Sequence, residues 1–217
     1  MKFSLDTKII KPEKSLEIKN AIILLHGYGG DGNDISMLTL NWKRYLPNTV
    51  FLCPNGHESC SINPVGFQWF DLTKDDPAYT LEQSKKAEIK LNEFIEEVKK
   101  KYKLENNQIC LSGFSQGCMM SINLGLTAKN EFNCIIGFSG KIIDQKDLKI
   151  RKKNSTNVSL IHGDTDEIVS PNHLLEAKDF FIRNNINVET HLIKNCGHNI
   201  PIESSSIALN YIKKNFL

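Results

Sequence analysis

A serine between two glycines carries the clearest chemical signal in the sequence. Ser115 lies in the segment GFSQG, between the apolar residues 109–111 and the apolar, helix-compatible residues 116–126. A strand that turns sharply into a helix exposes such a serine, and flanking glycines leave room for the neighbouring backbone. The first N–H groups of the helix, beginning with that of Gln116, then point at negative charge forming on an attacked carbonyl. The segment predicts a nucleophile and half of an oxyanion hole.

Two later loops could supply a general base and the carboxylate that orients it. Residues 158–162 predict a buried strand that leads into Asp164 and Asp166, and residues 188–193 predict a strand that leads into His198. A serine hydroxyl is a weak nucleophile at neutral pH, so a histidine must take its proton and a carboxylate must hold that histidine. The chain order Ser115, Asp166, His198 is that of α/β-hydrolases. Spacing alone leaves Asp164 open as the carboxylate.

Other serines and histidines are less suitably placed in the predicted elements. Ser112 lies on the strand side of the GFSQG turn, His162 is still within its strand, and His191 is in mid-strand. Parallel strands present ligand-binding side chains just beyond their carboxyl ends, so these three positions are disfavoured.

A glycine-rich loop follows the predicted buried strand 21–25. Its sequence, HGYGGDGND, contains neither the Gly-Lys of a phosphate-binding P-loop nor the G-x-G-x-x-G pattern. In α/β-hydrolases an early strand-to-helix loop supplies the second oxyanion donor, and we predict the backbone N–H of Tyr28 for this role. We expect His26 to brace the loop.

Residues 54–79 form a long segment rich in Pro, Asn, Gly and aromatic residues. Long stretches without regular structure in a compact domain are usually functional or disordered, and Phe67, Trp69 and Phe70 argue against disorder. We predict that this loop flanks a substrate pocket and that the three rings bind substrate. The alternative is that the rings anchor a surface loop in the core.

The remaining pattern predicts one α/β domain over residues 1–217, with a mostly parallel central sheet and helices on both faces. Residues 3–18 predict the edge strands of an antiparallel hairpin, and Thr80 with Gln83 predicts the capped start of a long helix. Further strands are expected at 21–25, 49–53, 109–111, 134–138, 158–162 and 188–193, and further helices at 116–126, 172–183 and 204–216.

The composition and the apolar segments indicate which kinds of partner and which cellular location to expect. The chain is 40% hydrophobic with a net charge of +2 and scattered lysines, which argues against a nucleic-acid partner. The apolar run 21–25 is too short for a signal peptide or a membrane span, so we expect a cytoplasmic protein without integral membrane association. The six cysteines lie mostly in apolar runs and form no C-x-x-C pair, so we expect free thiols and no metal site.

The sequence resembles the phospholipase/carboxylesterase family, which includes acyl-protein thioesterases and small bacterial carboxylesterases. Six ordered motifs along nearly the whole chain carry the resemblance: LLHGYGGDGND, FQWFDL, GFSQG, GFSG, HGDTDEIVSP and CGH. The resemblance implies a nucleophile, an orienting carboxylate, a base and two oxyanion donors, which are Ser115, Asp166, His198 and the N–H groups of Tyr28 and Gln116. It also selects Asp166 over Asp164. The sequence departs from the family at Cys118, where Gly or Thr is common, and at Ser170, where valine is common before proline.

Together these observations predict a serine hydrolase that cleaves carboxylic esters through an acyl-enzyme, with no metal or organic cofactor. No large apolar lid insertion is evident, which favours short-chain or single-acyl esters, either small molecules or lipid-like. The resemblance also admits an acyl-protein thioesterase acting on S-acylated proteins, or a lysophospholipase. A peptidase on the same fold and an inactive binding module are two competing hypotheses, and the aromatics of residues 54–79 could instead serve a homodimer.

Overall fold

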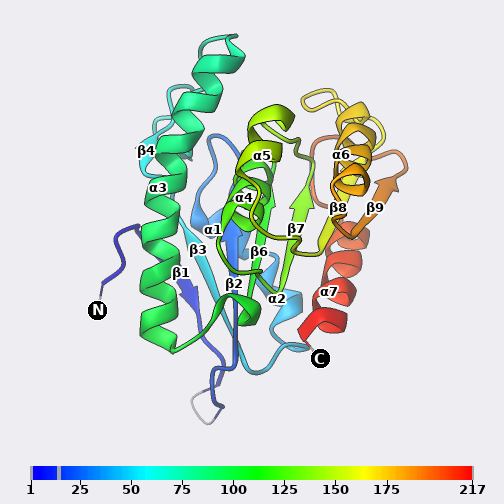
Figure 1. Cartoon of the computed structure of the whole chain (residues 1–217). Coiled ribbons are helices and arrows are strands. Elements are labelled where there is room, and N and C mark those ends of the chain that lie inside the picture. The colour runs from blue at the N-terminus through cyan, green and yellow to red at the C-terminus, as the bar shows by residue number, and fades with distance from the viewer. Residues whose placement is uncertain (1, 14–15, 217) are drawn as a thin grey trace.

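A seven-stranded sheet runs through the centre of the structure, a computed structural model that describes residues 2–13 and 16–216 (Figure 1). The strand order is β1-β3-β2-β6-β7-β8-β9. All neighbouring strands are parallel except β1, which is antiparallel to β3. The strands are β1 (Thr7–Ile10), β2 (Asn20–Leu25), β3 (Thr49–Pro54), β6 (Ile109–Phe114), β7 (Cys134–Phe138), β8 (Val158–Gly163) and β9 (Val188–Ile193).

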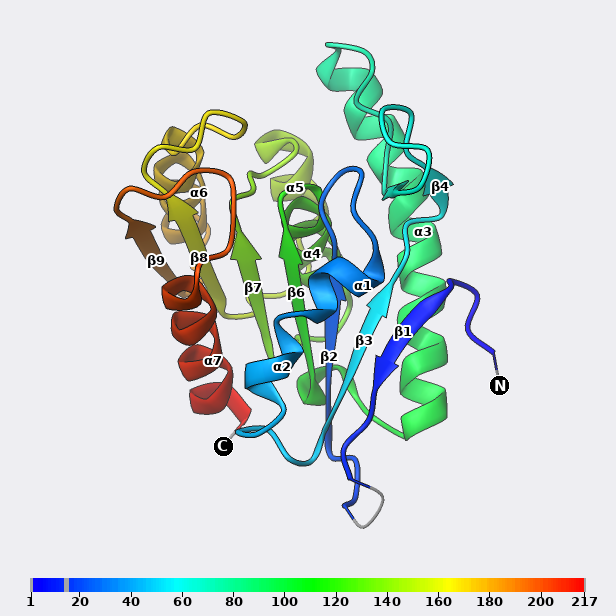
Figure 2. The ribbon, with the colours of Figure 1, turned by 180° about the vertical axis from the view of Figure 1, so that it is seen from behind.

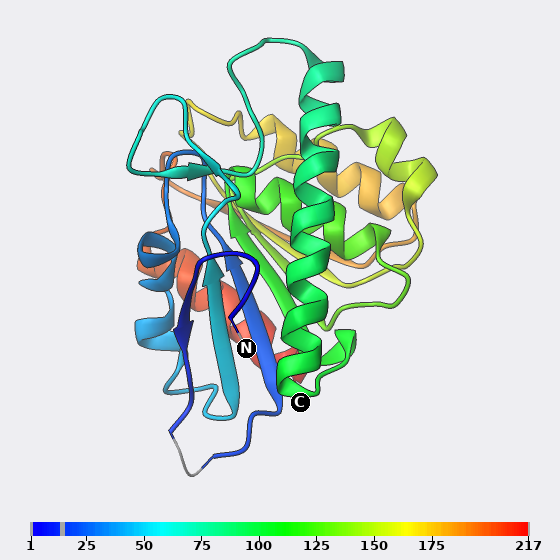
Figure 3. The same cartoon turned by 90° about the vertical axis from the view of Figure 1, so that its left-hand side faces the viewer.

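Helices cover both faces of the sheet, as predicted. One face carries α3 (Pro77–Tyr102), α4 (Gln116–Thr127), α5 (Gln145–Arg151) and α6 (Asn172–Arg183), in front of the sheet in Figure 1. The opposite face carries α1 (Gly32–Ser36), α2 (Thr39–Trp42) and α7 (Ile202–Phe216), seen in Figure 2. Figure 3 views the sheet from its side, with α3 on one face and α1 and α2 on the other.

Alternating side chains of the strands supply both cores. In β2, Ile23 and Leu25 pack with residues of α3 and α4, whereas Ile22 and Leu24 pack with residues of α1, α2 and α7. Strands covered on both faces carry continuous apolar runs because every side chain is buried. This is why AIILL and TVFLC were recognisable as strands in the sequence.

The predicted N-terminal hairpin is wrong. Among the described residues of the segment 3–18, only Thr7–Ile10 forms a strand, and it pairs with β3, with Thr7 opposite Pro54 and Ile10 opposite Phe51. Residues 14–15, on which part of the prediction falls, lie outside the described residues. The open edge of β3 offers a row of unpaired backbone groups, and β1 satisfies them.

Helix α3 begins at Pro77, one turn before the predicted Thr80. The carboxylate of Asp76 accepts hydrogen bonds from the N–H groups of Ala78 (2.9 Å) and Tyr79 (3.3 Å). An aspartate N-cap followed by proline is a strong start signal, because proline lacks only an N–H that would be unpaired anyway. The Thr80–Gln83 pair lies inside the helix.

An ion-pair network joins α3, α4 and α5. Arg151 donates two hydrogen bonds to the buried Glu88, at 2.7 and 3.0 Å, and one to Asp147 at 2.6 Å. Lys85 contacts the other oxygen of Asp147 at 2.7 Å, and the amide of Asn123 donates to Glu88 at 3.0 Å. The network fastens three helices to one another with every carboxylate paired.

The six cysteines are free and buried. Burial raises the pKa of Cys53 and of Cys118 to about 12, so these thiols stay protonated. Within residues 2–13 and 16–216, no helix has the length and apolar character needed to cross a membrane.

Candidate active site

The turn between β6 and α4 holds Ser115 in a strained backbone conformation, with φ 52° and ψ −115°. A Cβ on Gly113 would overlap the backbone of Gly117, and a Cβ on Gly117 would overlap the carbonyl of Leu25. The Ser115 N–H donates to the carbonyl of Phe138 at 2.8 Å, which ties the turn to β7. The two glycines therefore permit the close approach, and the surrounding backbone sustains the strain.

His198 and Asp166 meet at the same edge of the sheet. The Nδ1–H of His198 donates to Asp166 Oδ2 at 2.8 Å, and Asp166 Oδ1 accepts from the N–H groups of Ile168 (2.9 Å) and Val169 (2.8 Å). Burial acts to raise the pKa of Asp166, but the hydrogen bonds from Val169, His198 and Ile168 outweigh it and hold the pKa below its usual 3.8. An ionised Asp166 fixes the proton of His198 on Nδ1 and leaves Nε2 for proton transfer.

Asp164, the alternative carboxylate, does not contact His198. It is exposed, and its Oδ1 accepts from the N–H of Cys196 at 3.3 Å, so it links the two loops. Ser112 and His191 also lie apart from the contact between His198 and Asp166, since Ser112 is buried within β6 and His191 lies within β9.

His162 braces the loop that carries Asp166. Its Nε2–H donates to the carbonyl of Val169 at 2.8 Å and lies 3.3 Å from Asp166 Oδ2. Burial lowers the pKa of His162 below its usual 6.5, against the opposing effects of Val169 and Asp166. A neutral His162 can therefore hold the loop without adding a charge beside Asp166.

Three loops converge around Ser115. The ring of Phe114 lies 4.7 Å from that of His198, centroid to centroid. A Cβ built on Gly27 would lie 3.0 Å from the Phe114 ring and 3.4 Å from Ser115 Cβ. The Ser115 hydroxyl itself makes no hydrogen bond to any described residue, His198 included. Catalytic hydrogen bonds are often long or misaligned in enzymes before substrate binds.

The backbone N–H groups of Tyr28 and Gln116 belong to two of these loops. Neither N–H has an acceptor among the described residues of the chain. Tyr28 follows β2 and Gln116 opens α4, and β2 and β6 are parallel neighbours whose residues Leu25 and Gly113 lie opposite each other. Both predicted oxyanion donors therefore lie beyond the carboxyl ends of adjacent strands.

His26 braces the glycine-rich loop, as expected. It is 1% exposed, its Nδ1–H donates to Gly27 O at 2.7 Å, and its Nε2 accepts from the N–H of Gly56 at 2.9 Å. Burial lowers its pKa, which keeps the ring neutral with the proton on Nδ1. Both ring nitrogens form hydrogen bonds with backbone groups, so the ring has a structural role.

The three aromatic residues predicted to bind substrate do not line the cavity beside His198. Trp69 and Phe70 are buried, at 0% and 1% exposure, and Phe67 lies in the short strand β5 (Phe67–Gln68), which pairs with β4 (Glu58–Ser59). The Trp69 indole N–H donates to the carbonyl of His26 at 2.9 Å, and the two rings stack with centroids 4.9 Å apart. The second interpretation of this loop, in which the rings anchor it in the core, describes Trp69 and Phe70, because both belong to the buried cluster that contains residues of α3 and α4.

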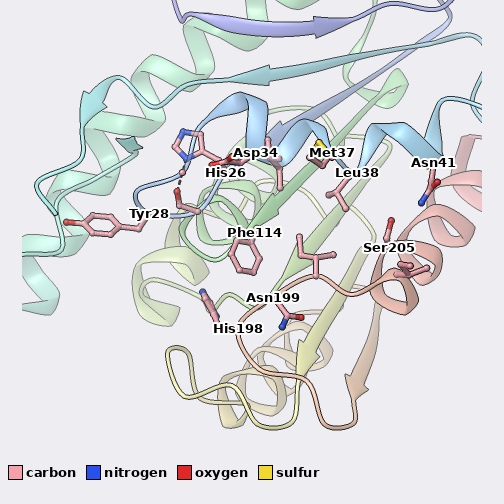
Figure 4. A pocket seen from close by; sticks show the side chains of 15 residues that line it. His26, Tyr28, Asp34, Met37, Leu38, Asn41, Phe114, His198, Asn199 and Ser205 are labelled. Atoms are coloured by element: carbon pink, nitrogen blue, oxygen red, sulfur yellow. Dashed lines mark hydrogen bonds between the residues drawn. The ribbon is translucent and has the colours of Figure 1, made fainter. Parts of the chain in front are cut away.

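A cavity of about 480 Å³ opens beside His198, between α1–α2 and the segment that leads into α7. Figure 4 shows His26 and Tyr28 at one end, Met37 and Leu38 along the wall, and Asn41 and Ser205 at the other end. Its apolar lining consists of Ile35, Met37, Leu38, Phe114, Ile200 and Ile202. Pockets of this size and character hold small organic ligands.

Sequence reasoning missed the lining residues Ile35, Met37 and Leu38 because it missed α1 and α2. The two helices have five and four residues, too few for a helical hydrophobic period to be visible. One signal was present: Asp31, whose side chain accepts from the N–H of Asp34 at 2.8 Å, is an N-cap directly after the glycines.

Comparison with known proteins identifies the family of the chain. The sequence profile of the phospholipase/carboxylesterase family matches residues 6–216. The esterase YpfH of Escherichia coli (strain K12) is 27% identical over 200 residues, covering 88% of this chain and 81% of that protein. Acyl-protein thioesterase 1 of Yarrowia lipolytica is 27% identical over 210 residues, covering 89% and 91%. The crystal structure of esterase PE8 has a TM-score of 0.92 and 31% identity, covering 97% of this chain and 98% of that one. The chain therefore belongs to the phospholipase/carboxylesterase family and is a carboxylic ester hydrolase of the α/β-hydrolase fold.

Proposed function

We propose that the protein is a serine hydrolase that cleaves acyl esters through a covalent acyl-enzyme, with Ser115 as nucleophile, His198 as general base and Asp166 as its orienting carboxylate. The observation that carries the proposal is the 2.8 Å hydrogen bond from His198 Nδ1 to Asp166, with the His198 ring against Phe114, the residue before a serine at a strained strand-to-helix turn. This combination leaves His198 Nε2 free to exchange a proton next to the nucleophile.

In the proposed reaction, Ser115 Oγ attacks the carbonyl carbon of the ester while His198 Nε2 takes its proton. The N–H groups of Tyr28 and Gln116 stabilise the oxyanion, and loss of one such donor typically costs 10² to 10³ in kcat, as an order of magnitude. The tetrahedral intermediate expels the alcohol, which receives the proton from His198. Water then attacks the acyl-enzyme, gives its proton to His198, and releases the acid as Ser115 regains its proton.

The cavity supports a small acyl ester as substrate. It has apolar walls beside His198 and polar groups from Asn41 and Ser205 at the far end, so an apolar chain can enter it over a limited length. Each buried methylene contributes about 0.8 kcal/mol, or roughly fourfold in kcat/KM, until the chain fills the space. Esters of short and medium acyl chains fit this description, and thioesters of the same acyl groups would occupy the same cavity.

The test compares chromogenic acyl esters and thioesters of increasing chain length, together with labelling by a serine-reactive phosphonate. Wild-type protein should hydrolyse the esters with an optimum at short or medium chains, and the Ser115→Ala variant should lose both turnover and labelling. Ser155→Ala, a serine distant from the site, should behave as wild type.

An inert wild-type protein, or labelling that persists in Ser115→Ala, would contradict the proposal. A continuous rise towards the longest chains would overturn the assignment of short acyl groups, and hydrolysis of matched anilides at comparable rates would favour a peptidase.

A further inference from the structure

We infer that the segment 67–70, together with the side chain of Gln116, positions the two oxyanion donors relative to each other. We call this set of residues the clasp. The inference rests on the proposed function, because it concerns the geometry of the oxyanion hole formed by Tyr28 and Gln116.

The two donors need such a device because they come from separate loops. Tyr28 lies in the loop after β2 and Gln116 in the turn after β6, and an oxyanion is stabilised only when both N–H groups lie about 2.7 to 3.1 Å from one oxygen position. The pairing of Leu25 with Gly113 fixes the ends of the strands. Both donors lie beyond that last pair, where the sheet no longer sets their separation.

At one end, the clasp binds the side chain of Gln116. The amide Oε1 accepts from the backbone N–H of Trp69 at 2.8 Å, and the amide Nε2 donates to the carbonyl of Phe70 at 2.7 Å. Gln116 is 1% exposed, so these bonds are shielded from water. Two bonds from one planar amide to consecutive residues fix both the position and the orientation of the side chain.

At the other end, the clasp binds the loop on both sides of Tyr28. The Trp69 indole N–H donates to the carbonyl of His26 at 2.9 Å. Phe67 exchanges two backbone hydrogen bonds with the loop, accepting from Gly29 N–H and donating to Gly30 O, both at 2.9 Å. Tyr28 is therefore held from the residues before and after it, by the same four-residue segment that holds Gln116.

This arrangement gives Trp69 and the Gln116 side chain a positioning role. If either is removed, the two loops lose a direct link and their N–H groups can separate or rotate. The loss should appear in the transition state, where the oxygen carries negative charge, much more than in substrate binding. Displacements of about 1 Å at a reacting centre can cost 10²-fold in rate.

The experiment uses Trp69→Phe, which removes the indole N–H and retains an aromatic ring, and Gln116→Met, which removes both amide hydrogen bonds and retains the length of the side chain. Neither change alters the backbone N–H of Gln116 or Tyr28. The matched control is Asn154→Ala, which removes a buried amide that donates to the carbonyls of Gly125 and Ala128 in another part of the chain. Thermal unfolding is measured for each protein, and active sites are counted with a phosphonate.

We expect kcat per active site to fall about 10- to 100-fold in each clasp variant, with KM within about twofold. Affinity for a boronic acid, which forms a tetrahedral adduct with the serine, should fall in parallel with kcat/KM. The double variant should lose less than the product of the single effects, because both changes act on one link. Asn154→Ala should lose thermal stability and keep its kcat.

The inference would be overturned if the clasp variants kept the wild-type kcat and the wild-type affinity for the boronic acid, even if their stability were lower. If Gln116→Met does not fold, Trp69→Phe decides the matter by the same readouts. A wild-type protein that neither hydrolyses esters nor reacts with the phosphonate would instead remove the proposed function, so the two failures are distinguishable.

Discussion

The two faces of the sheet are built differently. The face that carries α3, α4, α5 and α6 has three helices of 12 residues or more and the network around the buried Glu88. The face that carries α1, α2 and α7 includes helices of five and four residues and encloses the cavity. The first face secures the framework, and the second leaves space for a ligand. The residues proposed to react lie beyond the carboxyl ends of the strands, between the two faces, so we expect that stability and substrate choice can change independently.

The strongest test of this separation is Arg151→Met. It leaves the carboxylate of Glu88, at 6% exposure, without its two hydrogen bonds from arginine, so the free energy of unfolding should fall by about 3 kcal/mol. Ester turnover per folded molecule should be unchanged. Urea unfolding and active-site-normalised kcat measure the two quantities. In the control Lys86→Met, the broken pair with Glu82 is exposed, and we expect a change of no more than about 0.5 kcal/mol. A loss of kcat in Arg151→Met would show that the faces are coupled.

A smaller effect is expected from filling the cavity. Leu38→Trp places a larger side chain in the wall, so kcat/KM for a medium-chain ester should fall about tenfold, roughly the contribution of two buried methylenes, while acetate esters are little affected. Ile89→Trp, an exposed position on α3, should leave the chain-length profile unchanged. Equal losses for acetate and longer esters would mean that the acyl chain lies elsewhere.

Removing one helix N-cap on each face compares how the two faces contribute to stability and to substrate binding. Asp31→Ala removes the cap of α1, and Asp76→Ala removes the cap of α3, so each should lower the free energy of unfolding by about 1 kcal/mol. Only Asp31→Ala should also raise KM for esters, because α1 lines the cavity. Chemical unfolding and steady-state kinetics provide the measurements, and a raised KM in Asp76→Ala would contradict the separation.

The smallest predicted effect is a dependence of stability on pH. Burial lowers the pKa of His26 and of His162 below 6.5 in the folded protein. Above pH 6.5 these groups are neutral in both states, whereas below it the unfolded chain binds protons that the folded chain does not, so stability falls as the pH falls. His162→Gln keeps an amide donor near Val169 without a titrating group. Its unfolding temperature should therefore decline less steeply than that of wild type below pH 6.5. Parallel declines would exclude a contribution from His162.

Residues with a long or strict period were predictable from the sequence. The helix 172–183 and the strand 188–193 were predicted with the bounds that the structure has, because an amphipathic helix and an alternating strand leave their period in the sequence. The positions of Ser115, Asp166 and His198 beyond strand ends followed from the predicted strands 109–111, 158–162 and 188–193.

Features that depend on distant partners were not predictable. The burial of Trp69 depends on a carbonyl of His26 and on the amide of Gln116, and no local pattern reports either contact. The hairpin prediction failed for the same reason, since β1 pairs with β3 across a long stretch of chain. The cavity depends on two helices too short to show a period.

The buried cysteines allow the local opening of each face of the sheet to be measured separately. Cys118 packs in the cluster formed with α5 and α6, and Cys53 packs in the cluster formed with α1, α2 and α7. Only the thiolate reacts with disulfide reagents, and a pKa of about 12 makes the thiolate scarce while the residue is buried. Modification of either thiol by a disulfide reagent therefore requires local opening of the structure. Its rate at each cysteine measures how often that face of the sheet is uncovered.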